Sequence, residues 1–158
     1  MNQYVNEANE LLQMLCIKYG LKCIKARPKI FNSSLRPAKF CGKENCIAIN
    51  VNYLSGYDKK IFHEFRHYWQ RETYPKVYFW WLTEHKELYK DFQKSKKIVD
   101  GKKVRLAYIY CPLEKDAIAF EDNDEGDEDG LRNPILDESY WRKILEENTD
   151  EVSDDDTN

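Results

Sequence analysis

The stretch that decides the fold of this chain is Lys60-Ile61-Phe62-His63-Glu64-Phe65-Arg66-His67-Tyr68-Trp69-Gln70. It contains the pattern His-Glu-x-x-His, in which the two histidines stand four residues apart. On a helix, positions i and i+4 lie on one face, so His63 and His67 can direct their imidazoles at a single metal ion. Zinc is the expected occupant. Glu64 would then stand where a carboxylate can act as general base toward a metal-bound water.

The residues around this motif predict a buried helix. Apolar side chains recur at helical spacing within the stretch, and neither proline nor glycine occurs between Lys59 and Glu72. Two of the three histidines in the chain fall inside the motif. Scattered core histidines would rarely be placed in this way, so we interpret the pattern as a metal site and not as a chance match.

The length and composition of the chain set its broad class. Its 158 residues are enough for one core and too few for two full domains. No apolar run is long enough to span a bilayer, and the first residues lack the basic and apolar parts of a signal peptide. The five cysteines form no pairing pattern, which suits a reducing compartment. We therefore expect a cytoplasmic protein that does not enter a membrane.

Charge is unevenly distributed along the chain. Residues 121–158 contain sixteen acids against three basic residues, a net of −13, whereas residues 1–120 contain twenty-two basic residues against twelve acids, a net of +10. We expect residues 1–120 to form the folded domain and residues 121–158 to form an acidic, largely flexible tail with a short helix near 139–145. The basic residues are spread over several segments without a nucleic-acid motif, so nucleic acid is not an expected partner.

Periodicity and turn signals predict short strands between two helices. An amphipathic helix from Tyr4 to Tyr19 should end at Gly20, and strands should follow at about residues 21–26, 29–32, 38–41 and 46–53. A hairpin turn over residues 42–45 would place Cys41 and Cys46 opposite each other, both expected to be reduced. The elements predict an α+β fold with a small antiparallel or mixed sheet, in which the last strand directly precedes the motif helix.

The pattern after the motif helix is less regular. It predicts a helical segment over residues 77–92, a solvated loop over 94–103 and a strand or buried approach segment over 104–110. Pro112 then suits the first turn of a helix that runs from Leu113 to Phe120.

A second motif lies in this last helix, in the run Cys111-Pro112-Leu113-Glu114-Lys115-Asp116-Ala117-Ile118-Ala119-Phe120. Over residues 46–121 the chain resembles the zincin-like metallopeptidases, in particular the small ImmA/IrrE-type family and related phage and Gram-positive bacterial proteins. In those proteins the His-Glu-x-x-His helix is followed by a helix reading Glu-x-(Glu/Asp)-Ala-(Asn/Asp)-x-Phe. The positions that match are Glu114, Asp116, Ala117 and Phe120, and Ile118 departs from the pattern.

The resemblance implies a zincin-like minimal metallopeptidase fold with Glu114 as the third zinc ligand. Asp116 and His85 are the alternative ligands. In the family, an Asn or Asp at the position of Ile118 supports a histidine ligand by hydrogen bonding, so here that support must come from another residue or be absent. A donor for the oxyanion is also needed, and the sequence does not choose among Tyr108, Tyr110, His85 and Arg66.

Two functions follow as expectations. In the first, the protein is a zinc-dependent metallopeptidase that cleaves a protein or peptide substrate, such as a regulator, with the strand from Ile47 to Val51 as the sheet edge that receives an extended peptide. In the second, it is a catalytically silent or regulatory zincin-fold protein, such as a phage would carry, that binds and inhibits a partner protein. Glu64 separates the two, because a general base is needed only for the chemistry. The sequence does not indicate an oligomeric state.

Overall fold

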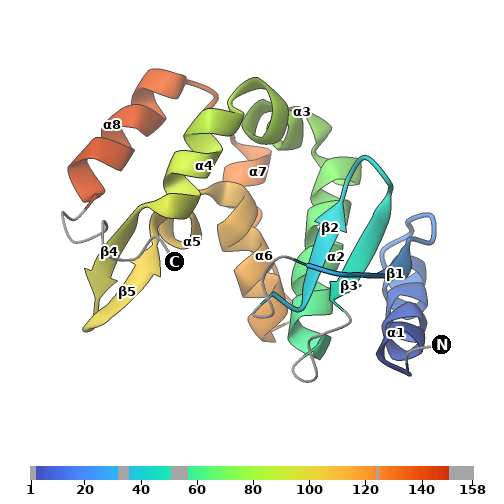
Figure 1. Ribbon diagram of the computed structural model, residues 1–158. Coiled ribbons are helices and arrows are strands. Elements are labelled where there is room, and N and C mark those ends of the chain that lie inside the picture. The colour runs from blue at the N-terminus through green and yellow to red at the C-terminus, as the bar shows by residue number, and fades with distance from the viewer. Residues whose placement is uncertain (1–2, 32–35, 51–56, 124, 150–158) are drawn as a thin grey trace. The chain divides into compact units, whose positions relative to one another are not determined.

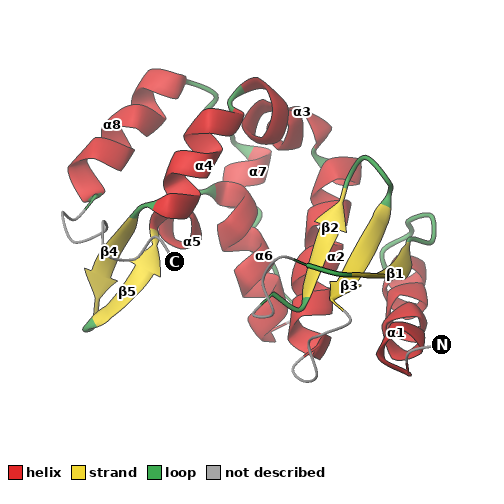
Figure 2. Ribbon diagram, viewed as in Figure 1, coloured by secondary structure: helices red, strands yellow, loops and turns green. Residues whose placement is uncertain are grey.

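The computed structural model describes residues 3–31, 36–50, 57–123 and 125–149. The chain divides into two compact units, a first unit of Met1–Thr73 with Phe120–Glu125 and a second unit of Tyr74–Ala119 with Gly126–Asn158. The described residues form helices and two small sheets (Figure 2), so the predicted α+β class is confirmed at that level. No helix among the described residues is long and apolar enough to cross a bilayer.

The first unit packs two helices against a three-stranded sheet (Figure 1). Its elements are α1 (Gln3–Lys18), β1 (Lys25–Lys29), β2 (Ala38–Cys41), β3 (Cys46–Asn50) and α2 (Tyr57–Thr73). The strand order is β1-β3-β2, with β1 parallel and β2 antiparallel to β3, so the sheet is mixed as predicted. The predicted end of α1 is also confirmed: Gly20 has φ +67°, and the Leu21 amide donates to the Cys16 carbonyl at 2.9 Å.

The strand expected to receive a peptide is the central strand of this sheet. β3 is paired with β1 on one side and with β2 on the other, so it has no open edge and the prediction is wrong. The error arose because the parallel pairing of β1 with β3 joins residues that are distant in sequence and leaves no local signal. The hairpin prediction is confirmed: Cys41 lies opposite Cys46, both are free thiols, and Asn45 adopts a left-handed conformation in the turn. Residues 51–53 of the predicted strand lie outside the described residues.

The two faces of the sheet differ sharply. One face carries Ala26, Ile47, Ile49, Ala38 and Phe40, all buried. This face belongs to the core of the first unit, in which Phe40 packs on Tyr68 of α2 with ring centroids 5.9 Å apart. The alternation along each strand places the lysines and arginines on the other face.

The second unit is mainly helical. Its elements are α3 (Pro75–Phe79), the π-helix η1 (Trp80–Glu84), α4 (Lys86–Lys94), β4 (Lys96–Val99), β5 (Lys102–Arg105), α5 (Leu106–Tyr110), most of α6 (Pro112–Asn123), α7 (Asp129–Arg132) and α8 (Glu138–Asn148). The predicted loop over residues 94–103 is in fact a β-hairpin, turned by Asp100 and Gly101 at positive φ. Where a strand or buried segment was expected over residues 104–110, β5 ends at Arg105 and α5 follows.

The C-terminal region contributes to the core of the second unit. Leu131 of α7 and Trp141 of α8 are buried, and the Trp141 indole N–H donates to the Ile135 carbonyl at 2.7 Å. The Asp137 carboxylate caps α8 by accepting from the Ser139 amide. Residues 129–148 are therefore folded where the sequence predicted flexibility, and the expected helix near 139–145 is longer. The assignment of residues 1–120 to a metallopeptidase domain stays a prediction.

Candidate metal centre

Helix α2 brings His63 and His67 together. Their ring centroids lie 4.9 Å apart, as the i, i+4 spacing predicts. The helix is fixed by its apolar residues Ile61, Phe65 and Tyr68, which are buried in the first unit. Because these anchors occupy one stripe of the helix, the histidines are held on a different side from the sheet-facing residues.

Both imidazoles are held through Nδ1. His63 Nδ1 lies 2.7 Å from Oε1 of Glu121, and His67 Nδ1 lies 2.8 Å from Oε1 of Gln70. A carboxylate and an amide oxygen can only accept, so each Nδ1 carries a proton and donates it. In that tautomer the lone pair is on Nε2, which is the nitrogen that can bind a metal.

Glu121 is the partner that supports His63. Burial tends to raise the pKa of its carboxyl, but the hydrogen bond from His63 and the charge of Lys60, 3.4 Å away, outweigh that effect and lower the pKa. Glu121 is therefore ionised at neutral pH and is a strong acceptor. The sequence left open whether another residue replaces the support that Ile118 cannot give, and Glu121 is that residue.

Glu64, the expected general base, is also buried in the first unit. Its Oε1 accepts a hydrogen bond of 2.6 Å from the backbone N–H of Phe40. That N–H belongs to β2, an edge strand of the sheet, so the strand fixes one carboxylate oxygen of Glu64. No hydrogen bond within the described part of the chain involves Oε2, the oxygen that a general base would use.

Glu114 lies in the first turn of α6 and is buried in the second unit. Its carboxylate accepts a hydrogen bond from the hydroxyl of Tyr89 in α4. Burial raises the pKa of Tyr89 well above its ordinary value, and the negative charge of Glu114 raises it further. Tyr89 thus stays protonated and acts as a permanent donor that orients Glu114.

Glu114 and Glu121 belong to the same continuous helix. They are seven residues apart on α6, which is close to two full turns, so they share one face of the helix. Asp116, two residues from Glu114, points to a different side. It is fully buried and its Oδ1 accepts from the Asp127 amide at 2.8 Å, so it ties the segment after α6 to that helix.

The four residues considered as oxyanion donors occupy different environments. In the second unit, His85 Nδ1 lies 2.9 Å from Oε1 of Glu138, and its ring stacks on Trp80 with centroids 4.1 Å apart. The Tyr110 hydroxyl donates to Oδ1 of Asn148 at 2.7 Å.

Of the remaining two donors, Tyr108 lies beside Arg105, whose guanidinium carbon is 5.8 Å from its ring centroid. Arg66, in the first unit, is buried with its guanidinium carbon 3.5 Å from the Trp69 ring centroid and 4.7 Å from that of Phe120. The oxyanion roles of the four residues stay predictions, as does the role of Asp116 or His85 as an alternative ligand.

Sequence reasoning missed three residues that hold the candidate ligands, namely Gln70, Tyr89 and Glu121. Two of them had a usable signal. Gln70 follows His67 by three residues on one helix, and Glu121 follows Glu114 by seven. Tyr89 had none, since its contact with Glu114 joins two helices of the second unit.

The donor atoms of His63, His67 and Glu114 form a group that could hold a metal ion. Neutral imidazoles and a carboxylate make up the three-ligand sets of many hydrolytic zinc centres, in which water occupies the fourth position. Proton transfer from such a water requires a carboxylate that is held in place, and one oxygen of Glu64 is fixed by a hydrogen bond. No protein-family model matches this chain, and no curated protein or solved structure matches it either.

Proposed function

We propose that this protein is a zinc-dependent metallopeptidase whose ion is held by His63, His67 and Glu114. The observation that carries the proposal is the pair of Nδ1 hydrogen bonds, which sets both histidines of α2 in the tautomer that ligates through Nε2. Of the residues that the structure describes, these three form a group that could hold a metal ion, each offering one ligand atom.

The continuity of α6 supports Glu114 as the third ligand. Glu121 accepts from His63, so the face of α6 that bears Glu121 is turned toward the histidines of α2. Glu114 lies on the same face two turns earlier, and Tyr89 holds its carboxylate. The family resemblance implies the same residue. Asp116 is a weaker candidate because its side chain caps the segment after the helix.

The proposed reaction is hydrolysis of a peptide bond. Bound zinc would lower the pKa of a coordinated water and polarise the substrate carbonyl. Glu64 would act as the general base through Oε2, since the Phe40 amide holds Oε1 in place, and would pass the proton that it accepts to the leaving amine. Glu121 and Gln70 keep the imidazoles in the required tautomer throughout the reaction.

The substitution Glu64→Gln tests the chemistry directly. The amide keeps the shape of the side chain and removes its basicity, so peptide cleavage should fall about 10²- to 10⁴-fold, the usual contribution of a general base. Cleavage products are measured by mass spectrometry after incubation of wild type and variant with a proteome. Glu72→Gln, at an exposed position of the same helix, is the matched control. If wild type yields no products and Glu64→Gln keeps the biological effect, the protein is a partner-binding protein instead.

Metal content tests the ligand set separately. Elemental analysis should give one zinc per chain for wild type and for Asp116→Ala or His85→Ala, but much less for His63→Ala, His67→Ala and Glu114→Ala. A full zinc equivalent in the double variant of His63 and His67 would overturn the site. A greater loss of zinc in Asp116→Ala than in Glu114→Ala would show that the third ligand is Asp116.

A further inference from the structure

The outer face of the three-stranded sheet in the first unit gathers basic side chains. Alternation along the strands puts Lys25, Arg27 and Lys29 of β1 and Lys39 of β2 on the face opposite the core. Arg36, just before β2, is exposed and lines a pocket on this face. Residues 21–50 contain seven lysines and arginines and a single acid, Glu44, although the whole chain has a net charge of −3.

These five cations, defined here as the basic face, are exposed. None of them forms an ion pair with an acidic residue in the described part of the chain. Their charge is therefore not neutralised locally. On this face the central strand carries Cys46, Ala48 and Asn50, all three buried.

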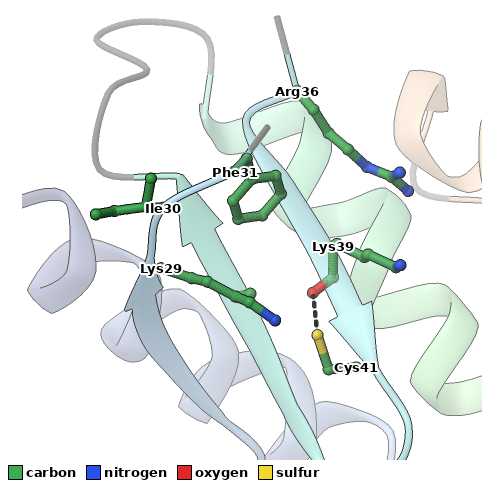
Figure 3. A pocket seen from close by; sticks show the side chains of 7 residues that line it. Lys29, Ile30, Phe31, Arg36, Lys39 and Cys41 are labelled. Carbon is green, nitrogen blue, oxygen red and sulfur yellow. Dashed lines mark hydrogen bonds between the residues drawn. The ribbon is translucent and has the colours of Figure 1, made fainter. Parts of the chain in front are cut away.

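A pocket of about 380 Å³ opens on this face, and three of the five cations line it. Its lining residues are Lys29, Ile30, Phe31, Arg36, Lys39, Cys41 and Ala48. Figure 3 shows the Phe31 ring between β1 and β2, with the ammonium group of Lys29 directed toward the middle of the pocket. An aromatic ring that is only partly buried thus stands among cations.

This combination fits a particular class of ligand. Cations that alternate along an extended strand recur about every 6.6 Å, a spacing suited to a chain that bears a charge on each unit. Sites for single-stranded nucleic acid combine such a positive surface, which follows the phosphates, with an aromatic side chain on which a base stacks. An acidic peptide would satisfy the cations and leave the ring of Phe31 without a stacking partner.

We propose that the basic face binds single-stranded nucleic acid, with phosphates on Lys29, Arg36 and Lys39 and a base stacked on Phe31. The sequence does not show these five cations as a cluster, because they are spread over fifteen positions among apolar and polar residues. They come onto one surface only when β1 and β2 flank β3. This site is separate from the proposed metal centre and does not depend on it.

Fluorescence anisotropy of the full chain with labelled twelve-nucleotide oligo(dT) and oligo(U) tests the proposal. Neutralisation of three phosphates gives a salt slope of about −2, so affinity should fall about 20-fold between 50 and 200 mM salt. The double charge reversal Arg27→Glu with Lys39→Glu should lower affinity at least tenfold. Phe31→Ala should lower it by roughly five- to 150-fold through loss of stacking.

The matched control is Lys102→Glu with Lys103→Glu, which makes the same charge change on the β4–β5 hairpin of the second unit. It should leave the affinity within about twofold of wild type. Circular dichroism establishes that each variant is folded, and the salt series on wild type needs no variant. The proposal is overturned by absence of binding at 50 mM salt, by equal losses in the control, or by displacement of the oligonucleotide by polyglutamate of equal total charge, which would point to an acidic peptide.

Discussion

Helices α2 and α8 are both amphipathic, but α2 buries polar and charged side chains as well as apolar ones. α8 buries Trp141 and keeps its charged residues at the surface, where Arg142 pairs with Asp91 and Glu138. α2 buries His63, Glu64, Arg66 and Gln70 beside its apolar residues.

The difference separates packing from chemistry. A polar group removed from water costs free energy unless it is hydrogen-bonded, and a helix needed only for packing has no reason to bury four of them. In α2 the described hydrogen bonds join Glu64 to Phe40, His63 to Glu121 and Gln70 to His67. The guanidinium of Arg66 contacts the rings of Trp69 and Phe120. We infer that the buried polar residues of α2 serve the proposed site, whereas the buried apolar residue of α8 serves packing.

The largest expected effect on stability is that of Trp141→Ala. Removal of a buried indole should lower the free energy of unfolding by about 3–5 kcal/mol. Zinc stoichiometry should be unchanged under conditions in which the variant is folded. Urea titration followed by circular dichroism measures the first quantity, with Tyr140→Ala at the adjacent exposed position as control. A loss below 1 kcal/mol would show that α8 does not hold the core of the second unit.

Glu121→Ala should affect zinc binding more than stability. Loss of the acceptor that holds His63 Nδ1 should weaken zinc binding about 10- to 100-fold with a smaller effect on stability. Competition with a chromophoric chelator gives the affinity, and Asp122→Ala, its exposed neighbour, is the control. Equal zinc affinity in the two variants would mean that Glu121 does not support the site.

The surface pairs of α8 should matter little. Arg142 lies 2.6 Å from Asp91, but both side chains are exposed by a third or more, so the coupling energy should be about 0.2–1 kcal/mol. A double-mutant cycle with Arg142→Ala and Asp91→Ala measures it. A coupling well above this range would place a structural ion pair on α8 and weaken the contrast with α2.

The smallest expected effect is the pH-dependent contribution of Glu138 to the stability of the protein. Hydrogen bonds from Arg142 and His85 lower the pKa of its carboxyl below the ordinary value of 4.5. A lowered folded-state pKa stabilises the fold above the unfolded-state value, and the contribution is lost as pH falls through the folded-state value. The stability difference between wild type and Glu138→Gln should therefore shrink as pH falls below about 4.5. A difference that is constant over this range would contradict it.

Local patterns predicted much of this molecule. The motif helix, the end of α1 at Gly20 and the hairpin from β2 to β3 each depend on residues a few positions apart, and all three are present. The pairing of His63 with His67 on one face follows from helix geometry alone.

What could not be predicted depends on contacts distant in sequence. β3 appeared to have one polar face because its residues alternate, yet all five of its residues are buried. Glu121 is 58 residues from His63. The apolar residues of α8 predicted a short helix. The acidic residues around it predicted a flexible tail, so the burial of Trp141 in the core of the second unit was not expected.

The distribution of the four tryptophans makes the two units optically distinct. In the second unit the indoles of Trp80 and Trp81 lie 5.0 Å apart and those of Trp81 and Trp141 5.1 Å apart, close enough for their electronic transitions to couple. The first unit has a single indole, Trp69, lying under the guanidinium of Arg66. Near-ultraviolet circular dichroism should therefore be dominated by the second unit. Fluorescence of Trp69 alone, after the other three indoles are replaced by phenylalanine, would follow the helix that carries the histidines.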